Sequence, residues 1–390
     1  MALAVAAIFG LFADASAQTR LQTALQGDLA AYLKTRGAIE HISAASASVS
    51  LAGGAANINV AAGATRFGGH EPVTAASLFQ IGSNTKAFTS VILLQLVAEH
   101  RLTLADTIGQ WLPQYPAWKT ITITQLLNMT SGIVGYDNIP AMLTAFAKAP
   151  YRTFTAKELV AYSYPRGEAP PLSHVWAYSN TAYILAQMII ERATGNSYDA
   201  EIHHRLLAPK LGLSSTYYAP SFYPKSVTAR LVSGYFYSHD PDNAPLAPLY
   251  GHDVKPLSLS WTQGAGGIVS SPKDVAHWVR QLYTGGVLKP AQRRELMSLV
   301  SNATGKAIAT TTIADPKGFG LGVGQITQPA IGTIWFYEGE TLGYRVIYGY
   351  FPRQDVVIAV GLNSQPDAKD DHIGELMTSL YATLHAAGKM

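Results

Sequence analysis

The pattern of the chain changes from β to helical and back to β, and this change constrains the fold most. Residues 46–51 and 57–62 are short β-compatible runs separated by a Gly-Gly pair, as in a hairpin. The middle of the chain, 102–292, predicts short helices joined by Pro- and Gly-rich loops. Four further β runs with turn residues between them then follow, at 318–326, 331–337, 344–351 and 356–362. We therefore expect one antiparallel sheet built from both chain ends, with a helical region inserted between them.

The same pattern predicts two lobes with a cleft between them. Residues 18–82 and 305–390 would form an α/β lobe, and residues 83–304 a mainly helical lobe. Helices at 21–36 and 370–385 would flank the sheet, the first ended by Gly37. The 390 residues are 48% hydrophobic, which is enough to build a large core. The predicted fold class is thus α/β in the α+β sense, an antiparallel sheet flanked by helices plus an inserted helical lobe.

Residues 1–17 have the pattern of a signal peptide. An apolar run reaches Phe12, and Ala-Ser-Ala at 15–17 is the small-residue pattern that a signal peptidase cuts, here before Gln18. The usual basic start is missing, because no Lys or Arg precedes Arg20, so an apolar helix kept within the protein is the alternative. The run is too short to span a bilayer. We expect a secreted or periplasmic protein without stable membrane insertion.

Composition excludes several other classes of function. The net charge is +3 and the basic residues are scattered, without the stripe that nucleic acid requires. The absence of cysteine excludes disulfides, thiolate zinc sites and a Cys nucleophile. The 11 histidines form no ligand pattern, and the glycines lack dinucleotide-binding spacing. We expect a small-molecule substrate with no metal, cofactor or nucleic-acid partner, and the oligomeric state stays open.

A Ser-x-x-Lys motif at residues 83–86 supplies a candidate nucleophile with its base. Residues i and i+3 of a helix share a face, so the Lys86 amine can reach the Ser83 hydroxyl. The helix predicted after Ser83 is almost wholly apolar, so a lysine charge there is costly unless it has a task or a partner. An N-cap serine beside a snorkelling lysine is the structural alternative. A second match at 270–273 reads as a chance occurrence, with Ser271 as an ordinary N-cap.

A Tyr-x-Asn element supplies the second vertex, and the sequence contains two. Tyr178 to Asn180 stands directly before a predicted helix, whereas Tyr136 to Asn138 lies in a Gly-flanked loop. We choose Tyr178 to Asn180. A surface aromatic beside an N-cap Ser179 is the alternative interpretation of Tyr178.

Taken together, these motifs resemble the serine β-lactamase and penicillin-binding protein family. The similarity is to the branch of class C β-lactamases, D-alanyl-D-alanine carboxypeptidases and related esterases, and it extends to residues 79–82, 126–132 and 264–271. The resemblance implies a β-lactamase/transpeptidase-like fold with the site in the cleft between the lobes. It also implies that Ser83, Lys86 and Tyr178 are catalytic and that Asn180 binds substrate.

The third element of the family, Lys-Thr-Gly or His-x-Gly, falls here at Tyr337 to Gly339. Tyr337 replaces the basic residue that helps to hold a substrate carboxylate, which favours esterase activity over efficient β-lactamase or carboxypeptidase activity. An esterase, a D-amino-acid peptidase and a weak β-lactamase all stay open. Tyr337, Gly339 and Glu340 would bind substrate, and the Glu340 N–H would be the second oxyanion donor beside that of Ser83. Arg345 could reach back into the cleft, with an exposed surface arginine as the alternative.

The expected reaction is acyl transfer through Ser83, with the base left open between two residues. A neutral Lys86 requires a pKa lowered from about 10.4 toward ~7.5, which burial can supply. Alternatively, an anionic Tyr178 held by a charged Lys86 accepts the proton. A penicillin-binding or sensor module that never turns over is the alternative to a hydrolase.

Overall fold

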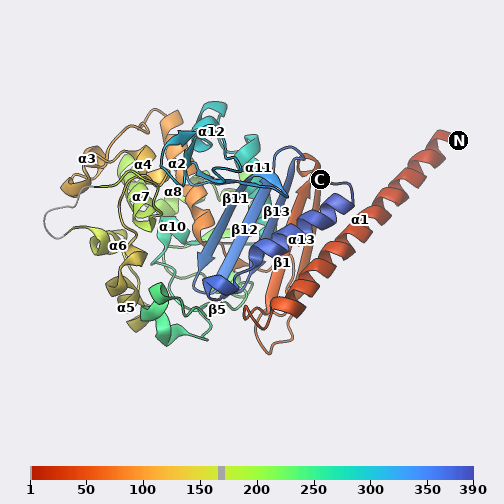
Figure 1. Ribbon diagram of the computed structural model, residues 1–390. Helices are drawn as coiled ribbons and strands as arrows, with labels where there is room; N and C mark the ends of the chain where they lie inside the picture. Colours follow the sequence, from red (N-terminus) through yellow and green to blue (C-terminus); the bar gives the residue numbers. More distant parts are fainter. Residues whose placement is uncertain (1, 166–171) are drawn as a thin grey trace.

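A nine-stranded sheet forms the centre of the described part of the chain (Figure 1). The computed structural model describes residues 2–165 and 172–390. The strand order is β2-β1-β13-β12-β11-β10-β9-β7-β8, and each neighbouring pair is antiparallel. The predicted fold class is therefore confirmed. The strands are β1 (Ala44–Leu51), β2 (Ala56–Gly63), β7 (Leu299–Ser301), β8 (Ala307–Ile308), β9 (Lys317–Phe319), β10 (Gly324–Gln328), β11 (Gly332–Thr341), β12 (Tyr344–Phe351) and β13 (Val356–Leu362).

Both ends of the chain contribute to this sheet. Strand β1 lies between β2 and β13, in a register that pairs Ala45 with Leu362. The Asn363 side chain accepts a hydrogen bond from the Ala44 N–H at 2.8 Å, which ties the two ends together. Helices α1 (Ala2–Arg36) and α13 (Ile373–Ala386) pack against each other on one face of the sheet (Figure 1).

Successive side chains of each strand point to opposite faces of the sheet and so belong to two separate apolar cores. On β12, Val346 and Tyr348 face the helical region and α11 (Pro272–Thr284), whereas Ile347 faces α1 and α13. Both faces are covered, so all eight residues of β12 are buried. Apolar residues at consecutive positions in this strand follow from that double coverage.

The helical region packs around one buried helix, α2 (Thr85–Ala98). Eleven of its 14 residues are buried, which explains its lack of a polar face. Helix α7 (Asn180–Thr194) packs beside it. The remaining helices are α3 (Ile108–Trp111), α4 (Ile123–Leu127), α5 (Pro140–Lys148), α6 (Ala156–Ser163), α8 (Tyr198–Arg205), α9 (Lys225–Thr228), α10 (Gln263–Gly266) and α12 (Pro290–Leu296).

Two small sheets join the lobes. One contains β3 (Phe79–Gln80), β6 (Ile268–Ser270) and β4 (Thr216–Tyr218), and the other pairs β5 (Tyr235–Phe236) with β14 (Ser364–Gln365) in parallel. The first sheet places the strand before Ser83 directly beside β6.

Two sequence predictions need correction. The single strand expected at 318–326 is two strands, β9 and β10, because the chain turns at Gly322 with φ +82°. A Cβ there would lie 2.7 Å from the Ser90 hydroxyl oxygen, so only glycine fits this turn. The first helix begins at Ala2 rather than at residue 21, and its N-terminal part projects from the body of the molecule (Figure 1).

Among the described residues, no helix combines the length and the hydropathy needed to cross a bilayer.

Candidate active site

Ser83 lies in a short 3₁₀ turn, η2 (Gly82–Asn84), that leads into α2. Gly82 adopts φ +49°, and a Cβ on it would lie 2.6 Å from the backbone nitrogen of Glu340. Only glycine permits this close approach of η2 to β11. The Ser83 backbone is therefore held at the N-terminal end of a buried helix and against the third strand motif, where the sequence predicts the two oxyanion donors.

Lys86 is fully buried and reaches Ser83, as the spacing predicts. Its ammonium nitrogen lies 3.0 Å from Ser83 Oγ, 2.6 Å from Asn180 Oδ1 and 2.8 Å from the Ala265 carbonyl oxygen. A charged lysine uses all three as acceptors. A neutral one donates to Asn180 and Ala265 and offers its lone pair to the Ser83 hydroxyl. The same geometry therefore satisfies Lys86 both with and without its third proton.

Tyr178 is the other hydrogen-bond partner of the Ser83 hydroxyl, at an oxygen–oxygen distance of 2.5 Å. Ser179 caps α7 by accepting from the Ala182 N–H at 3.2 Å, so the N-cap interpretation of Ser179 and a site role for Tyr178 hold together. The rival Tyr136 is also buried, but its hydroxyl donates to the Trp261 carbonyl at 2.5 Å. The structure thus brings Ser83, Lys86 and Tyr178 together.

Burial separates the proton affinities of the two candidate bases. It lowers the pKa of Lys86 to about 7, and the negative charge of Asp137 opposes that shift. It raises the pKa of Tyr178 well above 10, against the opposing hydrogen bond with Ser83. Near neutral pH, Lys86 exists partly as a free amine, whereas Tyr178 keeps its proton. The alternatives that the sequence leaves open are therefore not equivalent in this site.

The third motif lies on β11, beside η2. Gly339 has no room for a side chain, because a Cβ would lie 2.0 Å from the Ile81 carbonyl oxygen. Tyr337 is buried and lines the same cavity as Ser83 and Tyr178. Its hydroxyl has no hydrogen-bond partner of good geometry among the described residues. Glu340 follows with its backbone against Gly82. All seven site residues predicted from the sequence therefore meet at one end of α2.

A cavity of about 480 Å³ opens onto Ser83. Its wall includes aromatic side chains from three regions, among them Trp176, Trp261 and Phe319. Trp176 and Phe319 are in ring contact at 5.9 Å, and Phe319 contacts Tyr337 at 5.7 Å. Lys317 is the only Lys, Arg or His among the described residues that line it. The cavity suits a partly apolar small molecule.

Arg345 lies neither in the cleft nor on the surface, so both sequence-based interpretations are wrong. It is fully buried and ion-paired with Glu40 at 2.9 Å and with Asp371. The two carboxylates offset the desolvation cost of burying the guanidinium on this face of the sheet. The residue fixes the turn after α1 and the segment before α13 to β12.

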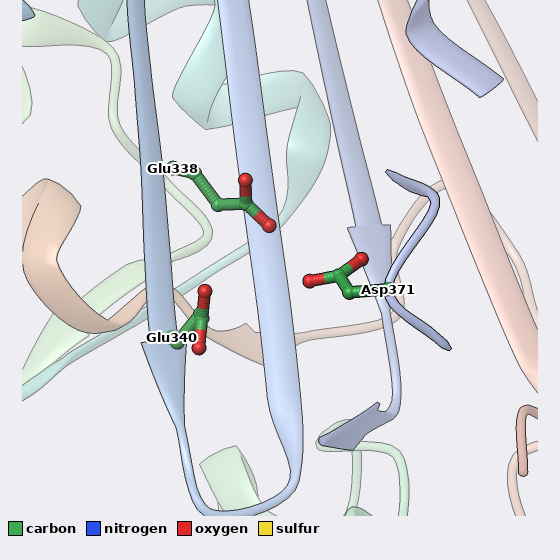
Figure 2. A group of neighbouring side chains, drawn as sticks. All are labelled: Glu338, Glu340 and Asp371. Atoms are coloured by element: carbon green, nitrogen blue, oxygen red, sulfur yellow. The ribbon is translucent and has the colours of Figure 1, made fainter. Parts of the chain in front are cut away.

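An acidic group, Glu338, Glu340 and Asp371, lies on that same face (Figure 2). One carboxylate oxygen from each lies within 4.8 Å of the others, a spacing that would suit a cation. Burial and the charges of Asp371 and Glu340 raise the pKa of Glu338 well above its usual range. Arg345 already supplies a positive charge to Asp371, so the group is partly neutralised within the protein itself.

Two groups that hydrogen-bond to Lys86 or to Asn180 were not predicted from the sequence. The Ala265 carbonyl accepts from Lys86, and Asp137 accepts from Asn180 Nδ2 at 2.7 Å. A backbone carbonyl has no side-chain signal, although it lies in the 264–271 stretch that carries the family resemblance. Asp137 belongs to the rejected Tyr-x-Asn element, which packs directly beside the chosen one.

Comparisons with known proteins agree with this arrangement. The sequence profile of the Beta-lactamase family matches residues 29–380. The chain is 26% identical over 279 residues to penicillin-binding protein 4* of Bacillus subtilis, covering 70% of this chain and 58% of the relative. It is also 26% identical over 283 residues to a putative D-alanyl-D-alanine carboxypeptidase of Escherichia coli, covering 67% and 62%. The chain thus spans about three-fifths of the length of these curated relatives.

A solved structure extends the likeness to nearly the whole chain. The D-stereospecific amidohydrolase from Streptomyces sp. superposes with a TM-score of 0.72 at 26% identity, covering 90% of this chain and 96% of the other. The fold of this chain is therefore that of a known structure.

Proposed function

The chain belongs to the Beta-lactamase family, and from this premise we propose that it is a serine hydrolase that forms an acyl-enzyme on Ser83. The observation that carries the proposal is the position of Ser83 Oγ, 3.0 Å from Lys86 Nζ and 2.5 Å from Tyr178 Oη. A serine hydroxyl is a weak nucleophile without an adjacent base, and this geometry provides one. The carboxypeptidase and amidohydrolase names among the relatives support hydrolysis of amide substrates.

In the proposed reaction, neutral Lys86 accepts the Ser83 proton as Oγ attacks the substrate carbonyl. The N–H groups of Ser83 and Glu340 stabilise the oxyanion. Tyr178, which keeps its proton near neutral pH, passes one to the leaving group. Water then attacks the ester on Ser83, and the same groups move the protons in reverse.

The proposed substrates are small esters and amides that need no bound carboxylate. Tyr337 stands at the strand position where the family places a cation, and Arg345 is held by acids on the opposite face. Lys317 is the remaining cation lining the described part of the cavity. A charge-assisted hydrogen bond contributes about 1.5–3 kcal/mol, so its loss lowers affinity for a carboxylate about ten- to a hundredfold.

The decisive measurement compares kcat/KM for p-nitrophenyl acetate and nitrocefin. We expect the wild type to favour the acetate and Tyr337→Lys to gain on nitrocefin relative to the ester, with Lys317→Met as the control for the other cation. Near-diffusion-limited nitrocefin hydrolysis by the wild type, or no relative gain in the Lys variant, would show that Tyr337 does not set specificity.

Intact-mass kinetics separate a hydrolase from a binding module that does not turn over. We expect an acetyl adduct on Ser83 that forms and is then lost within the turnover time, with an N-terminally free D-alanyl amide as the amide substrate for comparison. An adduct that persists for hours with every substrate supports the penicillin-binding or sensor alternative.

Residues 1–17 are proposed to be a signal peptide, and the protein to be secreted or periplasmic. The composition of that segment and the projection of the first half of α1 from the body support this (Figure 1). We expect the protein recovered from an exporting host to begin at Gln18 by mass spectrometry. An intact N-terminus in the cytoplasmic fraction contradicts the proposal.

A further inference from the structure

Asp137 is two hydrogen bonds away from the base, although no catalytic motif contains it. It lies in a 3₁₀ turn, η4 (Tyr136–Asn138). Its Oδ2 accepts from Asn180 Nδ2 at 2.7 Å, and Asn180 Oδ1 accepts from Lys86 Nζ at 2.6 Å. Carboxylate, amide, amine and nucleophile therefore form one continuous chain.

A side-chain amide has two ends of nearly the same shape and opposite character. The oxygen only accepts hydrogen bonds, and the NH₂ group only donates them. Lys86 is a donor and an ionised Asp137 is an acceptor, so the two residues on either side of Asn180 admit the same single orientation. Without Asp137, the amide is free to turn its NH₂ group toward Lys86, which removes an acceptor from the base.

The turn that carries Asp137 is itself fixed to the same helix as Asn180. The Tyr136 N–H donates to Thr181 Oγ1 at 2.8 Å. Gly135 lies so close that a Cβ on it would be 2.6 Å from Asp137 Oδ1. The Asp137 carboxylate is thereby enclosed between Gly135 and the start of α7.

We propose that Asp137 is a positioning residue, which holds the Asn180 amide with its oxygen toward Lys86. The inference rests on the proposed function, because this orientation matters for turnover only if Lys86 takes the Ser83 proton. Asp137 lines the cavity beside Asn180, and its hydrogen bond to the Asn180 amide connects it to Lys86.

The charge of Asp137 gives the proposal a readout that a purely structural role lacks. Among the described residues, the titratable groups around Lys86 are Asp137, Tyr178 and Tyr183, with the Tyr183 ring 5.5 Å from Nζ. Burial raises the pKa of both tyrosines well above 10, which leaves Asp137 as the acidic group of the three. Burial also raises the pKa of Asp137, against the hydrogen bond from Asn180 and the charge of Lys86. Its charge raises the pKa of Lys86 against the effect of burial. Removing that charge must lower the Lys86 pKa.

The test uses Asp137→Ala and Asp137→Asn in the full chain. Asp137→Ala leaves Asn180 unfixed, and we expect kcat for p-nitrophenyl acetate to fall about ten- to a hundredfold. Asp137→Asn keeps an oxygen that can accept from Asn180, and we expect it to recover most of kcat. The acid limb of the pH profile, where kcat/KM rises from low pH as Lys86 loses its proton, should nevertheless move to lower pH in Asp137→Asn.

Asp274→Asn serves as the matched control. Asp274 is a buried carboxylate that accepts hydrogen bonds from Ser215 and Thr216 and has none to Lys86 or Asn180. We expect its substitution to lower thermal stability and to leave the acid limb where it is.

A second measurement does not depend on turnover. The Lys86 pKa is read by NMR of ¹³C-labelled lysine side chains, with Lys86→Met for the assignment. A lower Lys86 pKa in Asp137→Asn supports the proposal, whether or not the wild type hydrolyses any substrate tested. An unchanged Lys86 pKa together with wild-type kcat in Asp137→Ala overturns it. Failure of the wild type to acylate Ser83 overturns the proposed function instead.

Discussion

Two segments of the chain share the Ser-x-x-Lys pattern, and the structure uses them in opposite ways. Residues 83–86 lead into α2, and residues 270–273 lead into α11. In the second, Ser271 accepts from the Asp274 N–H at 3.2 Å as an N-cap, and Lys273 is exposed. In the first, Lys86 is fully buried with three oxygen acceptors.

The contrast shows how the surroundings of the two segments differ. The helical spacing brings Lys86 to the Ser83 hydroxyl, whereas Ser270 ends β6 and lies outside α11, which carries Lys273. Only the apolar helix after Ser83 and the acceptors from α7 and α10 desolvate Lys86 while keeping its hydrogen bonds satisfied. The predicted N-cap role of Ser271 is confirmed, and the environment rather than the motif separates the two.

The largest effect expected from this contrast is on covalent labelling. Ser83→Ala should abolish acylation by a fluorophosphonate and lower kcat by about 10⁴-fold or more, because it removes the attacking oxygen. Ser270→Ala should label as the wild type does, since its hydroxyl is engaged with Thr216 at 2.8 Å. Mass mapping of the adduct to Ser270 or Ser271 in the Ser83 variant would falsify the assignment.

The next effect separates the two lysines. Lys86→Met removes the base and should lower kcat by about 10²–10⁴-fold, whereas Lys273→Met should leave kcat unchanged. Combining Lys86→Met with Tyr178→Phe should cost little more than either alone, because both residues serve one proton path. Losses that multiply in the double variant mean that the two residues act independently.

The pH profile should distinguish the two candidate bases. A lysine whose pKa is lowered to about 7 is inactive as a base below that pH and active above it. We therefore expect kcat/KM to rise about tenfold per pH unit up to pH 7 and then to level off. A limb that is still rising above pH 9 identifies an anionic Tyr178 as the base.

The smallest expected effect falls on stability rather than on chemistry. Ser271→Ala removes the cap of α11 and should lower the free energy of unfolding by about 1 kcal/mol in urea titrations. Acylation of Ser83 should be unaffected. A loss of labelling in this variant would couple the second segment to the site and weaken the contrast.

The sequence was sufficient to predict the fold class, because the β runs are strongly patterned. Its local motifs also named seven residues that the fold brings to one end of α2, and their roles stay predictions. It misplaced Arg345, since the partners of a buried arginine, Glu40 and Asp371, lie 305 and 26 residues away in the chain. It also missed Asp137, because nothing in the order of residues shows that the loop before α5 packs onto the start of α7. Long-range packing decides both cases.

The position of β1 between β2 and β13 has a consequence for biosynthesis. Ser43 and Asn363 are hydrogen-bonded across 320 residues of chain, so the sheet closes only after nearly the whole polypeptide has left the ribosome. Ser83 emerges early, but β11, which lies against Gly82, emerges with the final strands. A nascent chain therefore carries Ser83 for most of its synthesis without β11 beside it. The proposed site is complete only when these last strands join a sheet of high contact order.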